Sequence, residues 1–116
     1  MIIDGPFRWF QEIGYRVLVI QGTDKIDVDN DNVDVEVRFD SGTRYVGTFF
    51  TLNNIRHLME KWECTQECCA GGLYFWASDM VIVEKLTYET ILGTVRDLIS
   101  SGTIEQVLSR CDTGPV

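Results

Sequence analysis

The chain has 116 residues, of which 45% are hydrophobic and 24% are charged. This length and balance predict one folded domain spanning residues 1–116, large enough to bury a core without disulfides or metal ions. The 18 acidic residues outnumber the 10 basic ones, which gives a net charge of −8. Because the basic residues are spread singly along the sequence, we expect no binding to nucleic acid or to an anionic membrane. A basic partner would be attracted instead.

No segment approaches the roughly 18 consecutive apolar residues that a membrane-spanning helix needs. The N-terminal sequence MIIDGP lacks the basic start and the long apolar core of a signal peptide. These features predict a cytoplasmic protein. The only two prolines, Pro6 and Pro115, lie near the ends, so the interior lacks the breaks that separate domains.

The first half of the chain has the pattern of β-strands. The segments predicted as strands are residues 15–20, 26–28, 33–39 and 44–50. Residues 33–39 alternate strictly between apolar and charged side chains, the period of a strand with one buried face. Residues 40–43 predict a hairpin turn, in which Gly42 can adopt a positive φ. Connections this short require antiparallel pairing.

The second half changes to a helical period. Thr51 or Asn53 can cap a helix whose apolar side chains recur at i, i+3, i+4 and i+7. These side chains are Ile55, Leu58, Met59 and Trp62. A second β segment is predicted at 73–84 and a second main helix after Thr87, ending at Gly102. A capping-box pattern at 103–106 then predicts a short last helix.

Strands come mostly first in this order and helices mostly later. The sequence therefore predicts an α+β fold. We expect a largely antiparallel β-meander sheet, with two main helices and a short C-terminal helix packed on one of its faces.

The densest charged segment is residues 24–36, with six acidic residues against Lys25 alone. Part of it resembles a calcium-binding loop, but Asn32 stands where that loop needs glycine and Arg38 stands where it needs glutamate. The segment is either a solvated turn with a polar strand face or an acidic surface that receives a basic partner. On the second interpretation, the partner-binding residues are Asp27, Asp29, Asp31, Asp34 and Glu36.

Aromatic residues follow one another at 74–76. On a strand, Tyr74 and Trp76 share one face and Phe75 takes the other, so one set can pack in the core. The other set is either covered by a neighbouring element or exposed. An exposed Trp76 would be a typical anchor for a protein partner.

The four cysteines, Cys64, Cys68, Cys69 and Cys111, lack the paired spacing of a zinc site. His57 is the only histidine, and no sequence pattern places it near a cysteine or near Ser78 and Asp79 as part of a catalytic set. We therefore predict no catalytic residues, no metal ligands and no cofactor. A cysteine-dependent metal-binding protein, thiol enzyme or sensor is the alternative hypothesis.

Residues 44–110 contain several segments that resemble those of known small proteins. The segments TFFTL at 48–52, IRHLM at 55–59 and YFWASDM at 74–80, followed by the helix from 88 to 101, resemble small uncharacterised bacterial α+β proteins. They also resemble the compact acidic immunity proteins that neutralise bacterial toxins. The resemblance implies a bacterial binding protein and assigns no individual residue a role.

The leading functional hypothesis is a non-enzymatic binding domain, either a monomer or a homodimer, whose partner is a protein with a basic surface such as a toxin. The acidic residues would steer and pair with the partner, and the aromatic residues would anchor it. The third alternative is a homo-oligomeric domain in which a sheet face or edge pairs with itself.

Overall fold

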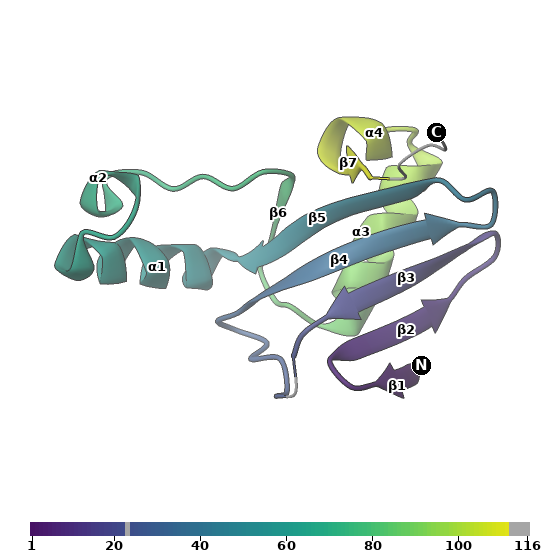
Figure 1. The fold of residues 1–116 in the computed structure, drawn as a ribbon, viewed down its shortest axis with the longest axis horizontal. Coiled ribbons are helices and arrows are strands. Elements are labelled where there is room, and N and C mark those ends of the chain that lie inside the picture. The colour runs from purple at the N-terminus through teal and green to yellow at the C-terminus, as the bar shows by residue number, and fades with distance from the viewer. Residues whose placement is uncertain (23, 112–116) are drawn as a thin grey trace.

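A mixed sheet of seven strands forms the body of the protein (Figure 1). The computed structural model describes residues 1–22 and 24–111. The strands are β1 (Ile2–Asp4), β2 (Phe7–Gln11), β3 (Tyr15–Ile20), β4 (Asn32–Phe39), β5 (Arg44–Thr51), β6 (Met80–Val83) and β7 (Ser109–Arg110). Strands β1 to β6 lie side by side in chain order, and β7 pairs with the first part of β5. Only the pairing of β5 with β6 is parallel, so the predicted α+β fold with a largely antiparallel sheet is confirmed.

Helix α3 lies across one face of this sheet (Figure 1). The helices are α1 (Leu52–Thr65), α2 (Cys69–Gly72), α3 (Tyr88–Ser100) and α4 (Ile104–Val107). None of them, within residues 1–22 and 24–111, is long and apolar enough to span a membrane. The core forms where α3, α4 and the covered face of the sheet meet. It contains Tyr15, Val17, Val19, Val33, Val35, Val37, Tyr45, Phe49, Val83, Leu86, Ile91, Val95, Ile104 and Leu108.

The alternation predicted for residues 33–39 explains which face is covered. Val33, Val35 and Val37 are buried in the core, and the residues between them lie on the opposite face, which we call the outer face. In β5, Gly47 faces the core where α4 approaches. A Cβ at Gly47 would lie 2.4 Å from the Leu108 side chain and 2.6 Å from the Asp79 carbonyl oxygen. Only glycine therefore fits at this contact.

Two predicted β segments differ from the structure, and two strands in the structure were not predicted. Residues 26–28 belong to the loop between β3 and β4 and form no strand, because Asp27 closes a turn with its own side chain. The second β segment is confined to β6, since residues 73–77 are irregular and Asp79 has a φ of 52°. Strands β1 and β2 were not predicted. They form a hairpin around Gly5, which has a positive φ.

Helix α1 leaves the sheet instead of covering it (Figure 1). Its Trp62 ring stacks on Phe75 with 5.7 Å between ring centroids and an interplanar angle of 8°. Phe75 in turn meets Phe50 edge-on at 5.1 Å. Phe50 follows the core residue Phe49 in β5, so this contact lies on the outer face. We expected α1 to pack on a face of the sheet. Instead, Trp62 of its apolar stripe packs against Phe75 in the segment that follows α2.

Replacing Leu86 by alanine tests the position of the core. Leu86 is 0% exposed and joins the cluster between the sheet and α3. We expect Leu86→Ala to lower the free energy of unfolding by about 2–5 kcal/mol, because it removes buried methyl groups and leaves a cavity. Urea denaturation followed by circular dichroism measures this. The matched control is Ile13→Ala, at a side chain that is 99% exposed, and an equal loss in both variants would contradict the packing.

Candidate binding surface

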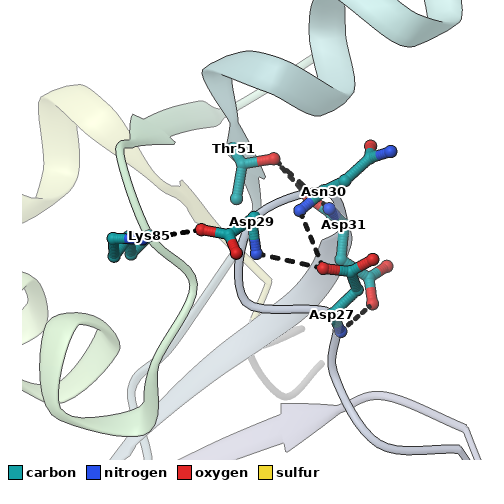
Figure 2. Close-up of polar contacts among 6 residues, drawn as sticks. All are labelled: Asp27, Asp29, Asn30, Asp31, Thr51 and Lys85. Atoms are coloured by element: carbon teal, nitrogen blue, oxygen red, sulfur yellow. Dashed lines mark hydrogen bonds and ion pairs between the residues drawn. The ribbon is translucent and has the colours of Figure 1, made fainter.

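The loop of residues 24–31, which we call the acidic loop, is held by its own carboxylates (Figure 2). The Asp27 carboxylate accepts hydrogen bonds from the backbone N–H groups of Asp29 and Asn30, at 3.1 and 3.2 Å. The Asp31 carboxylate accepts from the N–H groups of Asp27 and Asn32, at 2.9 and 2.8 Å. These are local side-chain to backbone bonds of the kind that aspartate makes in turns. Two of the predicted partner-binding residues therefore also fix the loop's shape.

The acidic loop docks on the junction between β5 and α1. Asp31 N–H donates to Thr51 Oγ1 at 3.2 Å, and Thr51 N–H donates to the Asp31 carbonyl oxygen at 3.0 Å. Thr51 is also the N-cap of α1, because its hydroxyl oxygen accepts from Asn54 N–H at 3.0 Å. The buried Asn54 side chain bonds the side chains of Asn30 and Asn32, at 3.0 and 2.9 Å. The same junction thus caps the helix and holds the loop.

A second attachment joins the acidic loop to the segment before α3. Lys85 Nζ lies 2.7 Å from Asp29 Oδ1, and Leu86 N–H donates to the Val28 carbonyl oxygen at 2.8 Å. The hydrogen bond with Asp29 and then its charge raise the pKa of Lys85. Both side chains are exposed, so this ion pair adds little stability. The backbone bond from the fully buried Leu86 fixes the position of the loop more firmly.

Four of the six predicted partner-binding residues gather at the acidic loop and the start of β4. Asp27, Asp29 and Asp34 are exposed and Asp31 is half-buried. Asp34 Oδ1 accepts from the Thr48 hydroxyl at 2.9 Å and lies on the outer face. No group of three His, Cys, Asp or Glu side chains in the described part of the chain is arranged to hold a metal ion. The exposed carboxylates of Asp27, Asp29 and Asp34 present a negative surface at this end of the sheet.

Glu36 and Trp76 lie outside this surface. Glu36 is 9% exposed, and its carboxylate pairs with Arg38 at 2.9 Å and Arg44 at 3.3 Å. Its charge is thus compensated within the protein. Trp76 is 61% exposed. It belongs to the segment between α2 and β6, which runs along the opposite side of the molecule from the acidic loop in Figure 1.

The cysteines lie mostly beyond the sheet, in and after α1. Cys68 Sγ and Cys69 Sγ are 3.0 Å apart, and neither forms a disulfide. The hydrogen bond with Cys69 and then burial raise the pKa of Cys68. A thiol with a raised pKa is a weak nucleophile at neutral pH, because little of it is thiolate. His57 is exposed on α1.

The fold also gathers basic residues that the sequence shows as scattered. Arg16 lies opposite Arg38, and Arg38 lies opposite Arg44, on three neighbouring strands. We call these three residues the arginine row. The row was missed because positions 16, 38 and 44 become neighbours only through the strand register.

Comparisons with protein-family models, curated proteins and solved structures found no match. The resemblance to immunity proteins therefore stays a prediction.

Substitution at Thr51 tests the junction that holds the acidic loop. Thr51→Val keeps the shape of this fully buried side chain but removes the hydroxyl that serves both Asn54 and Asp31. We expect the free energy of unfolding to fall by about 1–3 kcal/mol, because a helix cap and a buried hydrogen bond are lost together. Urea denaturation measures the change.

Asn53→Ala is the matched control, because Asn53 is the neighbouring cap candidate in the sequence and is exposed in the structure. It should change stability by less than about 0.5 kcal/mol. An equal loss in the two variants would show that Thr51 is not the residue that holds the junction.

Proposed function

We propose that this protein is a non-enzymatic binding domain for a protein with a basic surface, and that the acidic loop with Asp34 makes the recognition contacts. The observation that carries the proposal is the attachment of the loop at Thr51 and Leu86, which holds exposed carboxylates in one arrangement. A loop that is ordered before binding loses little conformational entropy when the partner arrives.

The charge of the whole chain supports the same proposal. A net charge of −8 attracts a basic protein over long range and raises the rate of encounter. Binding to an acidic surface then occludes the basic residues of the partner. Neutralisation of a basic toxin by occlusion is the activity that such binding would serve.

The surface proposed here is smaller than the one predicted from the sequence. Glu36 is left out because it is buried, at 9% exposed, and two arginines compensate its charge. Trp76 is left out because it belongs to the segment between α2 and β6, which lies apart from the acidic loop in Figure 1. The proposed binding involves no catalytic step.

Neutralising the acidic loop tests the proposal. The triple variant Asp24→Asn, Asp29→Asn and Asp34→Asn removes three exposed negative charges, and asparagine keeps the oxygen that accepts from Thr48. Partners retained by the wild type from a bacterial lysate are identified by mass spectrometry, and each is purified and titrated at several salt concentrations. We expect a basic partner whose dissociation constant rises at least about tenfold in the variant and with added salt.

The matched control is the triple variant Glu60→Gln, Glu63→Gln and Asp97→Asn, which removes three exposed charges from α1 and α3. It has the same net charge as the loop variant and should bind the partner almost as well as the wild type. Equal weakening in both variants would show that net charge alone governs binding. A purified partner insensitive to salt and to the loop variant would overturn the proposal.

A further inference from the structure

The arginine row crosses the outer face at the end of the sheet away from the acidic loop. Its members are direct cross-strand neighbours, and their side chains share a face because each precedes or follows a core residue, Val17, Val37 or Tyr45. Like charges directly opposite each other in a sheet destabilise it. Three arginines placed side by side therefore carry a repulsion that an anion would relieve.

The protein supplies one paired carboxylate for these three guanidinium groups. Glu36 accepts from Arg38 at 2.9 Å and pairs with Arg44 at 3.3 Å. Arg16 forms no ion pair with another described residue, and its guanidinium carbon lies 5.0 Å from the centre of the Trp9 ring. The guanidinium carbon of Arg38 lies 5.2 Å from the same ring. Stacking on a ring uses the face of a guanidinium and leaves N–H groups at its edge to donate.

The arginine row lines a shallow hollow of about 590 Å³. Gln11, which pairs with Arg16 across the strands, also lines the hollow, as do Asp40 and Gly42 of the hairpin turn. Asp40 is exposed and lines the hollow, and Glu36 pairs with two of the arginines from outside this lining. Three guanidinium groups are thus matched by two carboxylates. The hollow is thus a local positive site on a chain of net charge −8.

We propose that this hollow binds a small oxyanion of multiple charge, the phosphate or pyrophosphate group of a low-molecular-weight ligand. The planar forks of arginine match the geometry of phosphate oxygens and donate two parallel hydrogen bonds to them. An extended polyanion is disfavoured because its many charges are repelled by the rest of the acidic surface. A small ligand meets the local field of the three guanidinium groups instead. The site is distinct from the acidic loop, and the proposal does not depend on the proposed function.

Trp9 supplies a direct readout, because two of the three arginines contact its ring. The wild-type protein is titrated with sodium pyrophosphate, and sodium chloride keeps the ionic strength constant. We expect a saturable change in tryptophan emission with a dissociation constant that is roughly millimolar or tighter. Trp9→Phe should remove the change in emission, while calorimetry should still detect binding.

Substitution of Arg16 tests whether the arginine row binds the oxyanion. The Arg16 side chain is exposed, and its loss leaves both ion pairs of Glu36 in place. Arg16→Gln should weaken pyrophosphate binding by at least about tenfold, and Arg16→Lys should fall between it and the wild type. Arg56→Gln, at an exposed arginine on α1, is the matched control and should bind like the wild type. Thermal unfolding checks that each variant is folded.

The proposal is overturned if the folded wild type shows no saturable pyrophosphate binding, or if Arg16→Gln binds as tightly as the wild type. A parallel titration with phosphatidylserine vesicles separates a lipid headgroup from a soluble ligand. Binding to the vesicles without binding to pyrophosphate would also overturn it.

Discussion

Within residues 1–22 and 24–111, helices cover the sheet on one face only, and this constraint decides which side chains the other face presents. The covered face takes the valines of β3 and β4 together with Ile91 and Val95 of α3. Among the described residues no helix lies across the outer face, so charged side chains there pair with neighbours within the sheet. Glu36 forms ion pairs with two arginines, and the guanidinium group of Arg16 stacks on the Trp9 ring. The strand register therefore decides which charges meet on the outer face.

The junction of β5 and α1 is the second point on which the structure depends. Thr51 ends a strand, caps a helix and holds the acidic loop with one hydroxyl group. Because α1 turns away from the sheet at this point, the loop between β3 and β4 can dock against its first turn. The acidic loop and the arginine row thus occupy opposite ends of the sheet. This separation explains how a chain of net charge −8 also carries a positive hollow.

Elements with a long periodic pattern of apolar residues were predicted correctly from the sequence. Strands β3, β4 and β5 and helix α3 are confirmed, and so is the positive φ of Gly42 in the hairpin turn. The prediction failed at 26–28 because two alternating apolar residues are too few to outweigh the turn that Asp27 forms. It missed β1 and β2 because such short strands around Gly5 show no extended alternation.

The candidate sites were predictable to different degrees. Asp27, Asp29, Asp31 and Asp34 are neighbours in sequence, so their clustering was visible without a structure. Glu36 follows the same alternation, yet its pairing with Arg44 depends on the register of β4 with β5. The arginine row depends on two registers at once, and no local pattern in one sequence encodes them.

The proposed binding requires that the acidic loop is a fixed surface before any partner binds. Amide hydrogen exchange of the free protein, followed residue by residue by NMR, measures whether the loop is fixed. The N–H groups of Asp29, Asn30 and Asp31 donate to side-chain oxygens, so we predict exchange at least roughly tenfold slower than in an unstructured chain. Exchange of these three amides at the unstructured rate, while the amides of β4 stay protected, would contradict the account.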